Sequence, residues 1–152
     1  MRFYEEHEPL NVDDLKYFDE ENVEIPDDYK KFLIKYNGGR PENDHIDFKE
    51  GNNGTLLNCI FGFTKERYGS FVRYQGVYAG RIPRNTLAIA SDAGGNLIIM
   101  SVSGDDYGKI YFWDHEMEFN EGEEPDYSNL TLVADSFEEF ISNLKNESEL
   151  DN

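Results

Sequence analysis

Hydrophobic residues are densest in the second half of the chain, where three short runs alternate with turns rich in glycine and aspartate. Residues 87–90, 96–102 and 109–113 are mainly aliphatic and aromatic, a composition that favours β-strands. Residues 91–95 and 103–108 supply the Gly, Asp and Ser of tight turns. The pattern predicts a three-stranded meander on which the rest of the chain packs.

A helix is predicted after Pro26, because apolar residues recur at the spacing of one helical face. These are Tyr29, Phe32, Leu33 and Tyr36. Pro26 suits the first helical position, where its missing N–H needs no partner. The sequence Asn-Gly-Gly at 37–39 predicts the end of the helix, with glycine in the left-handed conformation.

A closing helix is predicted from the same spacing near the C-terminus. Its apolar face would consist of Phe137, Phe140, Ile141 and Leu144. Two overlapping capping boxes precede it, Asp135 with Glu138 and Ser136 with Glu139. The polar tail at 146–152 is expected to fray.

The other segments give weaker patterns. A helix capped by Asn11 is predicted at 11–20, and strands are predicted at 44–48, 55–63 and 130–134. Residues 64–80 contain three glycines, which favour an irregular segment over a short helix. At 152 residues, the chain is expected to form a single domain over 1–152.

The charge is strongly acidic and unevenly distributed. The chain holds 32 acidic and 14 basic residues, a net charge of −18. Residues 1–28 hold eleven acids and two bases, and residues 113–134 hold seven acids and no Lys or Arg, whereas residues 61–85 hold five bases and one acid. This balance argues against nucleic-acid binding and favours a basic protein partner. The alternative is that the acidity only keeps the protein soluble.

The sequence predicts a cytoplasmic protein that does not enter a membrane. Residues 1–10 lack the apolar core of a secretory signal, and no apolar run approaches the ~20 residues of a membrane span. The single cysteine, Cys59, lies in an apolar run and is expected to be a buried, unreactive thiol.

No motif predicts catalysis, a cofactor or a metal. Two sets of possible metal ligands occur, Asp114-His115-Glu116 and His45 between Asp44 and Asp47. Neighbouring residues of a strand point to opposite faces, and the spacings of zinc ligands are absent, so we interpret both sets as solvated polar residues. Gly94-Gly95 lacks the following helix of a phosphate site and predicts a hairpin turn. An enzyme with a carboxylate-bound divalent metal is the third alternative, ranked behind the two protein-binding functions described below.

Four stretches, in order, resemble the SUKH superfamily, which includes the fungal Smi/Knr-type regulators and many bacterial immunity proteins. They are 25–41 with its Asn-Gly-Gly, 89–96, 108–116 and 133–140. The resemblance covers about 23–144. It implies an α+β fold, with a mixed, mostly antiparallel sheet of about six strands flanked by N-terminal and C-terminal helices. It also implies a non-enzymatic protein that, in bacteria, binds and neutralises a cognate toxin, often a nuclease.

The long polar segment at 114–129 is the predicted contact surface, because it is acidic and falls outside the best-matched stretches. Its Glu, Gly and Pro content predicts an exposed, mobile loop. The candidate partner-binding residues are Asp105, Asp106, Tyr107, Asp114, Glu116, Glu118, Phe119, Glu121, Glu123, Glu124, Asp126 and Tyr127. We expect an immunity protein that occludes a toxin with this surface, or alternatively a regulatory or scaffold module that binds another cytosolic protein.

Overall fold

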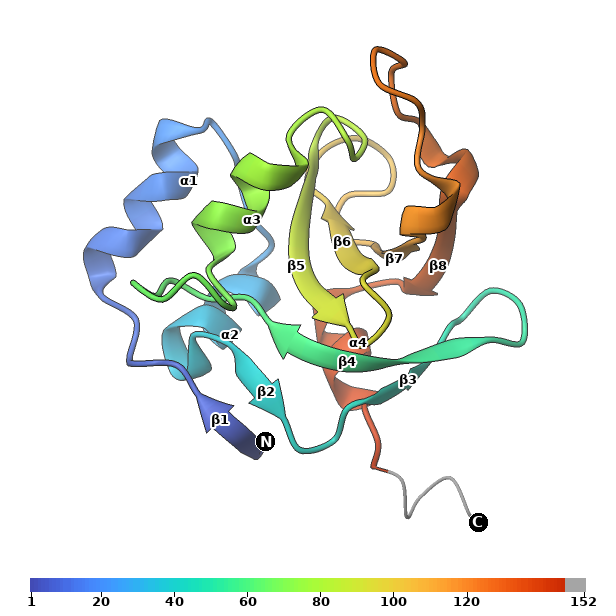
Figure 1. Cartoon of the computed structure of the whole chain (residues 1–152). Helices are drawn as coiled ribbons and strands as arrows, with labels where there is room; N and C mark the ends of the chain where they lie inside the picture. Colours follow the sequence, from blue (N-terminus) through green and yellow to red (C-terminus); the bar gives the residue numbers. More distant parts are fainter. Residues whose placement is uncertain (147–152) are drawn as a thin grey trace.

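The computed structural model describes residues 1–146 and shows a twisted sheet with helices on both faces (Figure 1). Residues 147–152, most of the tail predicted to fray, lie outside the described residues. The sheet has the order β1-β2-β4-β5-β6-β7-β8, with β3 paired to β4. The strands are β1 Phe3–Glu6, β2 Gly39–Pro41, β3 His45–Asp47, β4 Gly54–Ile60, β5 Thr86–Asp92, β6 Leu97–Ser101, β7 Ile110–Trp113 and β8 Leu130–Ala134.

The predicted α+β class is confirmed, and so is the mostly antiparallel sheet. Neighbouring strands pair antiparallel, and a parallel bridge joins Gly62 to Ser70. Within residues 1–146 the sheet has eight strands rather than about six, because β1 and β2 were not predicted. The helices are α1 Lys16–Glu20, α2 Asp27–Tyr36, α3 Phe71–Tyr78 and α4 Phe137–Ser142, with 3₁₀ turns at Val12–Leu15, His115–Met117 and Tyr127–Asn129.

The predicted meander is confirmed as β5, β6 and β7. Ile98 of β6 pairs with Phe112 of β7, and Leu97 pairs with Trp113. Every residue of β6 is buried, so this strand lies between two covered faces. The hairpin turn after β5 is built by Asp92, whose carboxylate accepts the backbone N–H groups of Gly94 and Asn96 at 2.9 and 2.7 Å.

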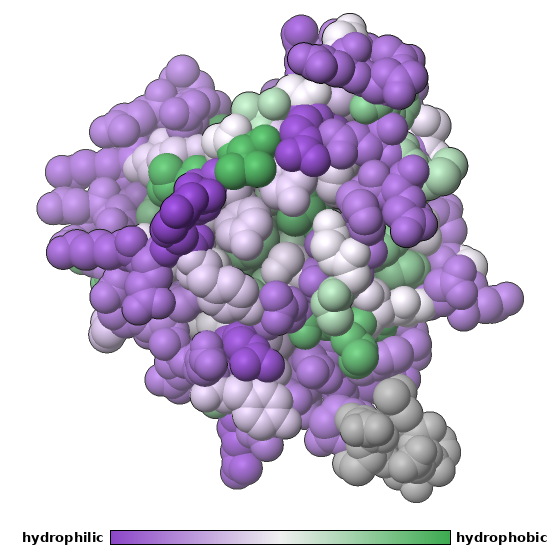
Figure 2. All heavy atoms as spheres, in the orientation of Figure 1, coloured by the Kyte–Doolittle hydropathy of each residue, from purple (hydrophilic) through white to green (hydrophobic). Residues whose placement is uncertain are grey.

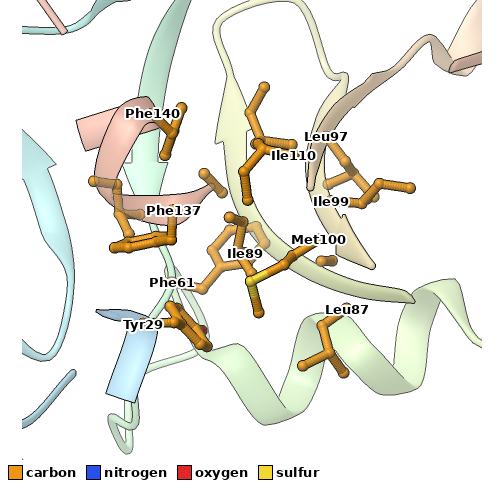
Figure 3. Close-up of a cluster of buried hydrophobic side chains, with 14 of the residues drawn as sticks. Tyr29, Phe61, Leu87, Ile89, Leu97, Ile99, Met100, Ile110, Phe137 and Phe140 are labelled. Carbon is orange, nitrogen blue, oxygen red and sulfur yellow. The ribbon is translucent and has the colours of Figure 1, made fainter. Parts of the chain in front are cut away.

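Helices α2 and α4 cover one face of the meander. In Figure 3, Tyr29, Phe137 and Phe140 lie on the side of Ile89 and Ile110, away from Leu97 and Ile99. Tyr29 of α2 packs edge-on against Phe137 of α4, with ring centroids 4.9 Å apart. The apolar faces predicted for the two helices therefore meet in the core.

Helix α3 covers the other face and corrects the prediction of an irregular segment. Its Tyr78 packs against Trp113, which shares a face with its pairing partner Leu97. Ser70 caps the helix by accepting the N–H of Arg73 at 3.3 Å. The Gln75 side chain binds both the N–H and the carbonyl of Ala88, at 3.0 and 2.6 Å, where β5 is bulged. Gly69 and Gly80, both at positive φ, lie outside the helix, so only Gly76 weakens its interior.

The end of α2 is built by Asn37, which takes the left-handed conformation that we predicted for glycine. Its φ is 53°, and it is completely buried. Its amide donates to the carbonyls of Glu8 and Phe63 at 2.8 and 2.9 Å and accepts the N–H of Phe63 at 2.8 Å. Pro26 lies one residue before the helix rather than at its first position.

The segment between β3 and β4 crosses the outer edge of β8. The N–H groups of Lys49 and Glu50 donate to the carbonyls of Val133 and Leu132 at 3.1 and 3.0 Å. The Glu50 carboxylate accepts the N–H of Leu132 at 3.1 Å.

The start of α4 uses one of the two capping residues that the sequence offers. Ser136 accepts the N–H of Glu139 at 3.1 Å, as predicted. Asp135 is not the cap, and its carboxylate pairs with Lys49 instead.

Candidate functional site

The acidic segment at 114–129, here called the acidic loop, joins β7 to β8 and projects from the body at the top of Figure 1. It lies on the same side of the molecule as the connection between α3 and β5. The face shown in Figure 2 is mainly hydrophilic, with small hydrophobic patches between the hydrophilic residues. The projection places the acidic loop where a partner can reach it.

Both ends of the acidic loop form 3₁₀ turns, which were not part of the prediction of an exposed, mobile loop. Asp114 caps the first 3₁₀ turn by accepting the N–H of Glu116 at 2.9 Å, and Asp126 caps the second through the N–H of Ser128 at 2.8 Å. The bond from Ser128 lowers the pKa of Asp126. The Asn129 amide donates to the carbonyl of Met117 at 3.2 Å and ties the two turns together.

Two arginines from the connection before β5 hold the acidic loop. Arg81 makes a two-pronged ion pair with Glu118, with N–O distances of 2.7 and 2.9 Å. This hydrogen-bonded pairing lowers the pKa of Glu118. Arg84 pairs with Glu124 at 2.8 Å. The basic region at 61–85 therefore neutralises part of the charge that we had assigned to a partner.

Asp106 and Tyr127 form part of the internal support of the loop. Asp106 accepts the hydroxyls of Ser101 and Tyr111 at 2.7 and 2.9 Å, and the rings of Tyr111 and Tyr127 are 5.2 Å apart. Burial opposes ionisation of Asp106, but the hydrogen bonds from Ser101, Tyr127 and Tyr111 outweigh it and lower its pKa.

Tyr107 holds the preceding turn against the N-terminal part of the chain. Its hydroxyl donates to the carbonyl of Glu24 at 2.8 Å, and 42% of the residue is exposed. Burial raises the pKa of this phenol. Tyr107 therefore has a structural contact in addition to the surface that it offers.

The remaining candidates divide into bound and free groups. Glu123 accepts the N–H of Asn120 at 3.1 Å, and Phe119 is half-buried. The carboxylates of Asp105, Glu116 and Glu121 are exposed and make no hydrogen bond or ion pair within the described part of the chain. These three are the acids that a partner could reach without displacing an internal contact.

The acidic loop also borders two hollows in the surface. Residues 122–125 form one wall of a hollow of about 570 Å³, whose other walls are α1 and the connection from α3 to β5. A second hollow, of about 480 Å³, is lined by residues 118–123, by Pro125 and by residues 79–81. Ala79 and Gly80 border both hollows.

Side chains from the two sets of possible metal ligands make contacts within the protein. Asp47 binds His45 and Lys145 at 2.9 and 2.7 Å, and His115 binds the Asn96 side chain. Among residues 1–146, no group of three or more His, Cys, Asp or Glu could hold a metal ion. Cys59 is buried, which raises the pKa of its thiol to about 12.

The two arginines of the site were not among the residues predicted from the sequence. Arg81 and Arg84 belong to the basic stretch at 61–85, and the acidic stretch at 113–134 begins some thirty residues after them. The opposite charges of the two stretches were the available signal, but no local pattern predicts that they meet.

Comparison with known proteins agrees with the fold. The model of the SMI1 / KNR4 family (SUKH-1) matches residues 9–143. The SPbeta prophage-derived uncharacterized protein YokK of Bacillus subtilis (strain 168) is 36% identical over 141 residues, which cover 82% of this chain and 68% of the relative. No solved structure matches the chain. The helices that the structure describes are all too short or too polar to cross a membrane. The resemblance inferred from four sequence stretches is confirmed, and the chain belongs to the SMI1 / KNR4 (SUKH-1) family.

Proposed function

We propose that this protein is an immunity protein, which binds a cognate toxin and blocks it by covering its active surface. The toxin class that best suits an acidic inhibitor is a nuclease, because a nuclease needs a basic channel for its substrate. An acidic surface can fill such a channel in place of the phosphate backbone. Neutralisation by this route is a binding function and needs no catalytic residue.

The observation that carries the proposal is a set of three carboxylates free of internal partners, two on the projecting acidic loop and one on the turn between β6 and β7. Asp105, Glu116 and Glu121 are exposed and unpaired within the described residues. The loop is held at Glu118 by Arg81 and at Tyr127 by Tyr111. A surface that is already ordered loses less conformational entropy on binding, which favours a tight complex.

Co-expression with the product of the neighbouring gene tests the proposal, which expects that product to be a toxin. The wild-type chain should protect cells from the toxin and co-purify with it. Reversing Asp105, Glu116 and Glu121 to Lys should weaken the complex about a hundredfold at low salt and reduce its salt dependence, because attractive charges become repulsive.

A matched control reverses three exposed acids away from the loop. Glu6, Asp19 and Glu138 are exposed, and their side chains have no hydrogen bond or ion pair in the described region. Reversing them changes the net charge equally and should leave protection nearly unchanged. Equal losses in the two variants would show that net charge, not the acidic loop, binds the toxin. Binding to a neighbour that is not toxic would instead favour the regulatory or scaffold function.

A further inference from the structure

The larger hollow beside the acidic loop is lined in part by apolar residues. They include Ile82, Pro83 and Leu87, which are buried, and Val23 and Tyr17, which are half-buried. Its volume of about 570 Å³ lies within the ~300–1,000 Å³ typical of protein ligand sites. The hollow is therefore large enough for a bulky side chain with part of its backbone.

The rim of this hollow is acidic. Glu21, at the end of α1, and Glu123 and Glu124 of the acidic loop are exposed and line it. The one guanidinium on the rim, that of Arg84, is already paired with Glu124. Burial, together with the charge of Glu21, raises the pKa of the Tyr17 phenol. An occupant thus meets both apolar residues and negative charge.

We propose that this hollow receives an apolar side chain of the protein partner, flanked in the partner's sequence by Lys or Arg. This inference rests on the proposed function and names the place where the partner is anchored. The apolar side chain would be desolvated on Ile82 and Leu87, and the neighbouring cations would face Glu21 and Glu123. A buried anchor with a charged surround is the usual arrangement at the centre of a protein–protein contact.

Charge decides between the possible occupants. Nucleic acid and acidic peptides would be repelled by the rim carboxylates. A second copy of this chain, with a net charge of −18, would be repelled as well. A basic segment is the partner that the rim attracts.

Short peptides test the chemistry of the hollow directly. The probe is the acetylated, amidated tripeptide Lys-Trp-Lys, titrated into the ¹⁵N-labelled chain. The amides of Gly80, Asn85 and Gly122 should shift, and the shifts should shrink as salt is added. Glu-Trp-Glu should cause no shift, and Lys-Gly-Lys should bind at least about fivefold more weakly, because it lacks the apolar anchor. Shifts spread over all acidic surfaces, or equal binding of Lys-Gly-Lys, would overturn the inference.

Two pairs of variants separate the hollow from its surroundings. Ala79→Phe places a ring in the hollow from an exposed position, whereas Val77→Phe adds a ring on α3 away from it. Glu21→Lys reverses a rim charge, whereas Glu20→Lys makes the same change next to it but off the rim. Ala79→Phe should abolish binding of Lys-Trp-Lys, and Glu21→Lys should weaken it about fivefold. Both controls should bind as the wild type does.

The same variants distinguish this inference from the proposed function. If Ala79→Phe and the wild type capture the cognate toxin equally well, the hollow is not the anchor site, and the immunity function stands. If Lys-Trp-Lys binds in the hollow as expected but the wild type neither captures the toxin nor protects cells, the anchor site stands, and the immunity function fails.

Discussion

Asn37 connects three parts of the chain through a single buried side chain. Its amide binds the backbone of Glu8 and Phe63, and its own carbonyl lies 2.8 Å from a ring nitrogen of His7. The family-like Asn-Gly-Gly sequence therefore does more than end a helix. It joins the end of α2 to the segments that follow β1 and β4.

Replacing Asn37 with Ala should lower the free energy of unfolding by about 3 kcal/mol, because buried backbone groups lose their partners. Urea denaturation measures this loss. Alanine would also be strained at the φ of 53°. Asn37→Gly separates this strain from the loss of the hydrogen bonds, since glycine accepts the φ of 53° without strain but makes no side-chain bond. It should be about 1 kcal/mol more stable than Asn37→Ala. A glycine variant as stable as the wild type would show that the hydrogen bonds contribute nothing.

Asp92 should make stability depend on acid pH. Burial opposes its ionisation, but hydrogen bonds from Asn96, Thr55 and Gly94 lower its pKa below the usual 3.8. The folded chain therefore binds this proton less readily than the unfolded chain. The contribution of Asp92 is complete above pH 3.8 and is lost as the pH falls through its folded pKa.

The variant Asp92→Asn should show this titration by difference. The stability gap between wild type and variant, measured by urea denaturation from pH 6 downwards, should be constant at first and then narrow in acid. A gap that widens as the pH falls would contradict the assignment.

The helices and strands that the sequence predicted are those in which apolar residues recur at a regular spacing. The face of α2 and the alternating strands of the meander were found because burial imposes a periodic pattern on the chain. Strands β1 and β2 have four and three residues, and their pairing joins segments far apart in sequence. Local patterns contain no signal for such pairing. The acidic loop was recognised from composition, but its contacts with Arg81 and Arg84 depend on the folded arrangement.

Helix α3 was not predicted because all three glycines of residues 64–80 were taken as evidence against a helix, although only one of them lies inside it. Gly76 lies inside the helix at ordinary φ, and a Cβ added there would meet no atom within 4 Å. Gly76→Ala should therefore raise the free energy of unfolding by about 0.5–1 kcal/mol.

Gly69 provides the opposite case for the same substitution. It has a φ of 76°, and an added Cβ would lie 2.8 Å from a ring nitrogen of His7. Gly69→Ala should lower stability by about 1–2 kcal/mol. Thermal unfolding of both variants checks the pair, and a stabilised Gly69→Ala would contradict the assigned geometry.

The whole molecule should become more stable as salt is added at low ionic strength. With 32 acids and 14 bases, most carboxylates have no cation available, and the ion pairs present are on the surface. Salt screens repulsion between many acids and weakens only a few exposed pairs, which contribute little. The midpoint of thermal unfolding should rise by a few degrees between about 10 and 150 mM NaCl.

Neutralising repulsion by mutation should reduce this salt effect. Changing Glu6, Asp19 and Glu138 to Gln removes three charges that have no pairing partner in the described residues. The variant should melt higher than the wild type in low salt and show a smaller rise. A wild-type midpoint that falls with added salt would mean that the ion pairs outweigh the repulsion.

The crossing of β8 by Lys49 and Glu50 also bears on how the protein behaves when it is crowded. An uncovered edge strand can recruit a strand from another molecule and start a fibril. Here the carbonyls of Leu132 and Val133 and the N–H of Leu132 are already bonded to that segment. A strand from another molecule would first have to displace the segment that contains Lys49 and Glu50. Chains expressed at high level should therefore resist edge-to-edge growth along β8.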